Sequence, residues 1–195
     1  MKSMTETIVR CPACGAANRI PPEKNKIAAR CGKCHTLLPS GQQKNVPGEV
    51  FKLRCSHCGA KNKVPGERID AGPKCGKCGS LLKTEELFEP QPVMVTDGNF
   101  EEKVLKSPLP VLLFAWASWC RTCVAVTPII DQFAADAKGK IRVGKINVET
   151  SPMLASKFDI LSVPFLFIFD NGRMMESMPG ALQKHELMMK MAKYL

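Results

Sequence analysis

Aromatic residues are scarce in this chain, and its first half has almost none. Only Phe51 and Phe88 precede Phe100 among the 195 residues. Proteins that bind single-stranded nucleic acid stack bases on aromatic side chains, and the first half offers no such platform. The chain carries a net charge of +10, yet this scarcity weighs against a nucleic-acid partner.

Long apolar runs are also missing. No stretch of about 18 apolar residues is present, which predicts no membrane-spanning helix. The first seven residues, MKSMTET, lack the apolar core of a secretory signal. There is no Gly-x-Gly-x-x-Gly fingerprint for a nucleotide or flavin either. We therefore expect a cytoplasmic protein with no membrane partner and no organic cofactor.

Cysteine, in contrast, is abundant, and its ten residues form five Cys-x-x-Cys pairs. The last pair, Cys120 and Cys123, follows the apolar run at 111–117, where a buried strand is expected to lead into a helix. A helix N-terminus stabilises a thiolate through its unpaired N–H groups and its dipole. The second sulfur lies one turn away, within reach to close a disulfide. This placement favours thiol–disulfide exchange.

The other eight cysteines belong to a duplicated module, because residues 9–38 align without gaps on residues 53–82 at an offset of 44. Each copy has the spacing Cys-x₂-Cys-x₁₆-Cys-x₂-Cys, which is typical of a four-thiolate zinc site. The predicted ligands are Cys11, Cys14, Cys31 and Cys34 in the first copy and Cys55, Cys58, Cys75 and Cys78 in the second. His35 and His57 lie close by, but four cysteines already fill each site.

Each module has about 40 residues and few large apolar side chains, so its metal is expected to supply much of the folding energy. We predict two structural Zn²⁺ ions, one per module; two disulfides per module or bound iron are the alternatives. Two such centres would lower the net charge of residues 1–92 from +8 to about +4, which further weakens the case for nucleic acid.

The second half reads as a compact α/β domain in which short helices alternate with strands. The expected elements are a helix at 100–105, a buried strand at 111–117, a helix at 121–138 containing Pro128, a strand at 141–148, a helix at 152–158, a hairpin at 165–177 and a helix at 182–193. Asn171-Gly172 supplies the turn signal of the hairpin.

Residues 93–195 resemble a thioredoxin over essentially their whole length. The matching residues are Phe100, Pro110, Trp116, Trp119-Cys120-x-x-Cys123, Pro128, Lys145-x-Asn147, Pro152, Val163-Pro164, Asn171-Gly172 and Gly180-Ala181. The modules resemble the zinc ribbon of certain bacterial thioredoxins, here duplicated. The resemblance implies two zinc ribbons, at 1–45 and 46–88, before a thioredoxin fold at 89–195 with a mixed sheet flanked by helices.

The resemblance also implies roles for individual residues. Cys120 becomes the nucleophile, Cys123 the resolving thiol and Pro164 a cis proline that faces them. Trp119, Val163, Pro164 and Gly180 would line a groove for a substrate polypeptide. The implied function is a protein-disulfide reductase that carries electrons to disulfide-containing protein substrates, with a separate thioredoxin-reductase-type enzyme to recycle it.

Two departures from the family bear on the chemistry. Phe114 stands where thioredoxins usually carry a buried aspartate, so that Lys145 would lose its counter-ion, and a deprotonated Lys145 or a water is the candidate base for Cys123. Arg121-Thr122 replaces the family's Gly-Pro. A cation beside Cys120 would stabilise its thiolate and make the couple less reducing, unless Arg121 points into solvent and acts weakly.

Two functions of another class remain open from the sequence. The ribbons could bind protein or nucleic acid as an adaptor, with the second domain as a scaffold. Alternatively, oxidation of the ribbon thiolates could expel zinc and make the protein an oxidant-sensing switch.

Overall fold

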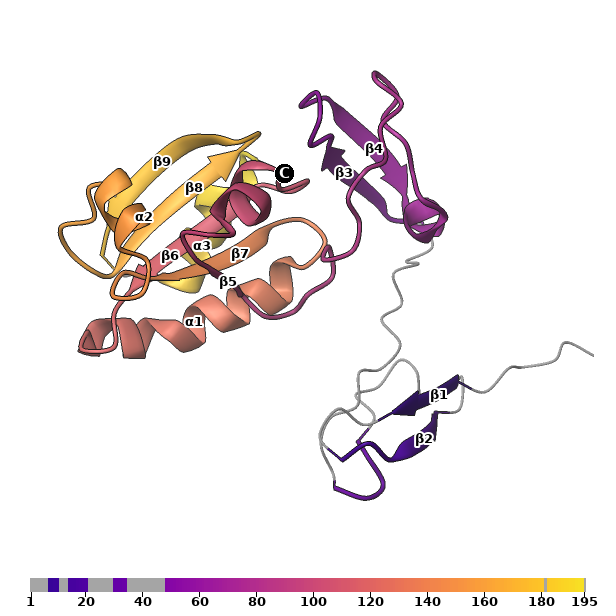
Figure 1. Ribbon diagram of the computed structural model, residues 1–195, viewed down its shortest axis with the longest axis horizontal. Helices are drawn as coiled ribbons and strands as arrows, with labels where there is room; N and C mark the ends of the chain where they lie inside the picture. The colour runs from indigo at the N-terminus through magenta and orange to yellow at the C-terminus, as the bar shows by residue number, and fades with distance from the viewer. Residues whose placement is uncertain (1–6, 11–13, 21–29, 35–47, 181, 195) are drawn as a thin grey trace, which may run out of the picture. The chain divides into compact units, whose positions relative to one another are not determined.

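The computed structural model describes residues 7–10, 14–20, 30–34, 48–180 and 182–194 (Figure 1). The chain divides into two compact units between residues 43 and 44, and each unit is described by itself. None of the helices in the described ranges is both long and apolar enough to cross a lipid bilayer.

The first unit contains an antiparallel hairpin of β1 (Thr7–Arg10) and β2 (Ala17–Ile20). The second unit begins with the equivalent hairpin of β3 (Val50–Arg54) and β4 (Lys61–Pro65), followed by the 3₁₀-helix η1 (Gly66–Ala71). At the offset of the sequence repeat, strand positions 7–10 correspond to positions 51–54. The two copies therefore share a local fold, and we call them ribbon 1 and ribbon 2.

The rest of the second unit is a five-stranded mixed sheet with helices on its two faces (Figure 1). The strands are β5 (Val93–Val95), β6 (Val111–Trp116), β7 (Arg142–Asn147), β8 (Phe165–Asp170) and β9 (Arg173–Pro179), in the order β5-β7-β6-β8-β9. The helices are the π-helical turn η2 (Glu101–Leu105), α1 (Arg121–Ala137), α2 (Pro152–Lys157) and α3 (Lys184–Ala192). Strands β5, β6 and β7 are parallel, and β8 and β9 run antiparallel to their neighbours.

Successive side chains of the central strands point to opposite faces of the sheet, so the core has two layers. On one face, α1 and α3 pack against side chains such as Phe114 and Leu166. On the other face, η2 and Leu154 of α2 cover Leu113 and Phe167. Because both faces are covered, β6 is apolar throughout and β8 is apolar up to its last residue, Asp170, instead of alternating with polar residues.

Most of the expected elements are present, with ends that differ by a few residues. Strand β5 was not expected from the sequence, because three residues are too short to show a periodicity. Helix α1 contains Pro128, as predicted. The turn between β8 and β9 has Asn171 at φ 53° and Gly172 at φ 72°, as the Asn-Gly signal indicates.

Replacement of Gly172 by alanine is expected to lower the free energy of unfolding by about 2 kcal/mol, since a left-handed backbone strains an L-residue. The added Cβ would also lie 2.9 Å from the carbonyl oxygen of Leu105. Chemical denaturation measures the change. Gly98→Ala is the matched control, because its Cβ would meet nothing within 4 Å. Equal losses in the two variants would contradict this account.

Candidate functional site

The redox site lies where β6 leads into α1. Cys120 and Cys123 are joined by a disulfide, and Cys120 is the residue that caps α1. The backbone N–H of Cys123 donates to the Cys120 sulfur at 3.1 Å. Cys123 is fully buried, whereas Arg121 between them is exposed. The sulfur of Cys120 thus receives a hydrogen bond at a helix N-terminus, an arrangement that stabilises a thiolate.

A second segment approaches the disulfide from the loop before β8. The Val163–Pro164 peptide bond is cis, as expected. The Cys120 sulfur lies 3.6 Å from the carbonyl oxygen of Val163, and the N–H of Gly180 donates to the carbonyl oxygen of Pro164 at 2.9 Å. Trp119 is 67% exposed beside the dithiol. The residues expected to form the substrate groove are therefore assembled around Cys120.

The position of the missing carboxylate is filled by Phe114. Its ring is fully buried in the same core cluster as Cys123. Lys145 lies opposite Phe114 in the register of β6 and β7. The expectation that Lys145 lacks a counter-ion is wrong, because its Nζ donates to Oδ1 of Asp131 on α1 at 2.5 Å. No carboxylate is among the buried residues of the described part of the chain.

Ribbon 2 brings its four cysteines together. Their sulfurs all lie within 4.8 Å of one another. The Cys55 and Cys78 sulfurs are 3.6 Å apart, and the Cys58 and Cys75 sulfurs are 3.7 Å apart. Tetrahedral zinc with Zn–S bonds of about 2.3 Å separates its sulfurs by about 3.8 Å. The cluster contains no histidine and has the size of a Zn(Cys)₄ site.

Ribbon 1 shows the same arrangement for three of its four expected ligands. The sulfurs of Cys14, Cys31 and Cys34 form a cluster, with Cys14 and Cys31 3.6 Å apart. Cys11, the fourth expected ligand, and His35 lie outside the described residues. Three sulfurs at this spacing fit a metal that a fourth thiolate completes.

The ionisation of the cysteines in ribbon 2 favours the binding of a cation. Hydrogen bonds from the backbone N–H groups of Cys78 and Lys77 lower the pKa of the Cys75 thiol to about 6. A backbone hydrogen bond from Ala60 lowers the pKa of Cys58, but burial and the three neighbouring sulfurs outweigh it and raise the value to about 11. The Cys58 thiol therefore stays protonated near neutral pH unless a positive ion joins the cluster, and Zn²⁺ would supply that charge.

An asparagine whose role the sequence analysis missed links the two cysteine turns of each ribbon. In ribbon 2, Nδ2 of Asn62 lies 3.6 Å from the Cys75 sulfur, and its Oδ1 accepts from the N–H of Gly76 at 2.9 Å. Asn18 makes the equivalent bonds to Cys31 and Gly32 in ribbon 1. The only sequence signal for this role is that the asparagine recurs at the same position in both copies.

Comparison with known proteins agrees with this geometry. The family model described as Thioredoxin matches residues 91–193, which is more than half of the chain. The chain belongs to the thioredoxin family. A second model, described as Thioredoxin 2, N-terminal, is a zinc ribbon and matches twice, at 10–36 and at 54–80. The protein is thus a zinc-ribbon thioredoxin with a duplicated ribbon.

Similar thioredoxins come from several lineages. The thioredoxin of Rickettsia bellii (strain RML369-C) is 44% identical over 93 residues, which cover 48% of this chain and 89% of the relative. Thioredoxin 1 of Nostoc sp. (strain PCC 7120 / SAG 25.82 / UTEX 2576) is 41% identical over 101 residues, 52% of this chain and 94% of the relative. The family and these relatives make the protein a thioredoxin-type oxidoreductase.

Replacement of Asn62 by alanine is expected to weaken zinc binding to ribbon 2 by about 10- to 100-fold, because groups that hold metal ligands in place tune metal affinity by this amount. Competition with a chromogenic zinc chelator measures the affinity. The exposed neighbour Lys61 provides the control variant, Lys61→Ala, which should retain the native affinity. Equal affinities of Asn62→Ala and the native protein would refute the role.

Proposed function

We propose that this thioredoxin reduces disulfides in other proteins through the Trp119-Cys120-Arg121-Thr122-Cys123 motif. The observation that carries the proposal is the Cys120–Cys123 disulfide at the start of α1, with the Cys120 sulfur facing the carbonyl of Val163. The oxidised pair is the product that one reduction cycle leaves behind. A reductase-type enzyme must then return two electrons and two protons to it.

The cycle has two exchange steps. The Cys120 thiolate attacks one sulfur of the substrate disulfide, so that a mixed disulfide forms and the other substrate sulfur leaves as a thiolate. The Cys123 thiolate then attacks the Cys120 sulfur, which closes the Cys120–Cys123 disulfide and releases the second substrate thiolate. Protons from solvent convert both substrate thiolates to thiols, and the substrate gains two electrons.

The residues around Cys120 have proposed roles in holding the substrate. A backbone segment at Val163 can pair with an extended substrate chain by β-augmentation. Exposed Trp119 offers an apolar ring beside the disulfide, and Pro164 and Gly180 form the adjoining wall. The groove therefore recognises mainly the backbone and the shape of the substrate chain, which suits an enzyme that accepts protein disulfides of varied sequence.

We also propose one structural Zn²⁺ in each ribbon, held by the eight cysteines predicted above. When bound, the ion fixes the fold of the ribbon and takes no part in the exchange. A reducing, cytoplasmic compartment suits both kinds of cysteine site, because it keeps the eight ribbon cysteines reduced and able to bind metal.

The function is tested by the reduction of a protein disulfide in the presence of a dithiol. The native protein should catalyse it, Cys120→Ser should abolish the catalysis, and Cys123→Ser should accumulate a mixed disulfide at Cys120 that mass spectrometry detects. Cys31→Ser, which alters only ribbon 1, is the control and should retain the activity. Full activity of Cys120→Ser would refute the proposal.

We propose that Lys145 accepts the proton of Cys123 in its neutral form; its ammonium group first releases a proton to solvent, and half-exposed Asp131, its ion-pair partner, is the proposed relay for that proton. Lys145→Met should slow the resolution of the mixed disulfide by about 10²-fold near neutral pH. Alkaline pH should restore the rate, because the thiolate then forms unaided. Stopped-flow measurement of substrate release gives the rate. An unchanged rate at neutral pH would assign the proton transfer to water instead.

A further inference from the structure

Ribbon 2 shares a core with the thioredoxin domain. Its cluster of buried residues contains the zinc ligands Cys55 and Cys75 and also Leu109, which lies just before β6. Phe88, from the segment that connects ribbon and domain, packs edge-on against Phe51 of β3 with ring centroids 5.2 Å apart. The metal site and the start of the central strand are therefore parts of one packed cluster.

Arg54 joins the ribbon to two strands of the sheet at once. Its backbone N–H donates to the carbonyl oxygen of Pro108, before β6, at 2.8 Å. Its guanidinium binds both carboxylate oxygens of Asp170, the last residue of β8, and the Nε–Oδ1 distance is 2.6 Å. The two side chains are only 16% and 12% exposed. A two-pronged ion pair shielded from water is among the stronger polar contacts in proteins. Arg54 directly precedes the zinc ligand Cys55.

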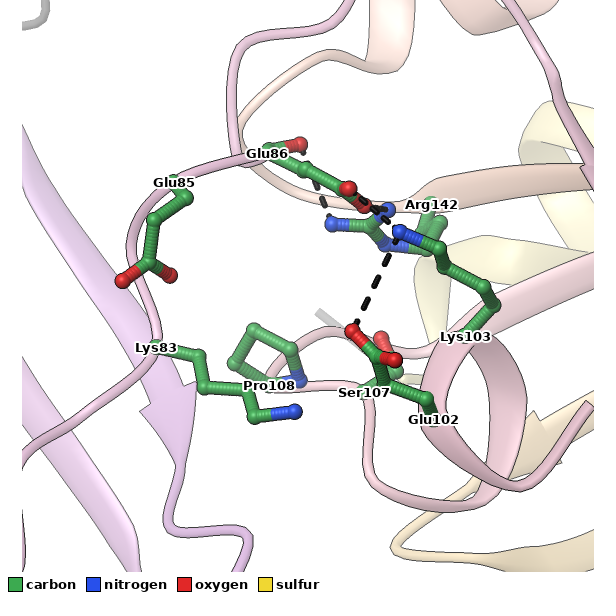
Figure 2. A pocket seen from close by; sticks show the side chains of 8 residues that line it. All are labelled: Lys83, Glu85, Glu86, Glu102, Lys103, Ser107, Pro108 and Arg142. Atoms are coloured by element: carbon green, nitrogen blue, oxygen red, sulfur yellow. Dashed lines mark hydrogen bonds and ion pairs between the residues drawn. The ribbon is translucent and has the colours of Figure 1, made fainter. Parts of the chain in front are cut away.

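The segment that connects ribbon 2 to the thioredoxin domain contacts β7, the third of the inner strands. Figure 2 shows Glu86 between Arg142, the first residue of β7, and Lys103 of η2. Lys103 and Arg142 lower the pKa of the Glu86 carboxyl group, which stays ionised. The carbonyl of Leu87 accepts from the N–H of Gly139 at 2.7 Å. Ribbon and connector thus contact the strands at several points.

These contacts all lie at one end of the three inner strands β6, β7 and β8. Val111 of β6 pairs with Arg142 of β7 and with Phe169 of β8, so the contacted ends are neighbours. The opposite ends of the same strands lead to Cys120 and come from Pro164. Ribbon 2 and its connecting segment therefore contact the central strands at the ends remote from the dithiol.

Ribbon 1 has Arg10 at the position of Arg54 but lacks the large apolar residues that make these contacts. At the repeat offset, Phe51, Leu87 and Phe88 correspond to threonine, glutamine and lysine at positions 7, 43 and 44. The similarity between the copies covers the metal ligands and the apolar positions 53, 64 and 82, but it does not cover Phe51, Leu87 and Phe88. We propose that ribbon 2 is a zinc-dependent clamp that stabilises the thioredoxin domain, a function that ribbon 1 does not share. This inference rests on zinc in the ribbons, not on the redox activity.

The two tryptophans report on the clamp, because Trp116 and Trp119 both belong to the thioredoxin domain. Thermal unfolding of the full reduced chain is followed by tryptophan fluorescence, with zinc content measured in parallel. Cys75→Ser and Cys31→Ser change equivalent ligands in the two ribbons, and each should lose one zinc. Only Cys75→Ser should lower the midpoint of the tryptophan transition, by about 5 °C or more.

A second pair of variants leaves the metal ligands intact and keeps the test decisive if Cys75→Ser does not fold. Arg54→Ala should keep two zinc ions and still lower the midpoint, while the equivalent Arg10→Ala in ribbon 1 should not. Equal midpoints for Arg54→Ala and Arg10→Ala, or for the two cysteine variants, would overturn the clamp. Unchanged zinc content in both cysteine variants would instead overturn the zinc assignment on which it rests.

Discussion

The hydrogen bond from the amide of Cys123 to the sulfur of Cys120 is the interaction on which the site depends. It exists because β6 delivers Cys120 to the cap of α1, where an N–H group of the first turn has no partner within the helix. Burial of β6 and α1 in one core cluster fixes that junction. The rest of the domain positions the Val163 carbonyl against the same sulfur.

Ten cysteines share one spacing but take two roles, and their surroundings decide between them. In the thioredoxin domain, the pair starts a helix and forms no cluster with a third cysteine among the described residues, so the two sulfurs bond to each other. In ribbon 2, two pairs meet from opposite turns, which Asn62 joins, and in ribbon 1 the sulfurs of Cys14, Cys31 and Cys34 cluster in the same way. Four sulfurs that face one another favour a shared cation over disulfides.

The longer strands of the thioredoxin domain, the redox pair and the ribbon cysteines that cluster in the described residues could be predicted, because each depends on neighbours in sequence. Val111 to Trp116 is an apolar run long enough to identify, and the cysteine spacing repeats. The ion pairs of Lys145 with Asp131 and of Arg54 with Asp170 could not be predicted in this way. They join residues from separate elements, and a charge pattern along the chain does not show which groups the fold brings together.

Phe114 has a consequence for how electron transfer is coupled to protons. An apolar ring occupies the interior beneath the dithiol, and the described core holds no carboxyl group that could change its ionisation there. The dependence of the reduction potential on pH is then set without a buried carboxyl group, by the two sulfurs themselves. An aromatic side chain thereby simplifies the titration behaviour of the whole couple.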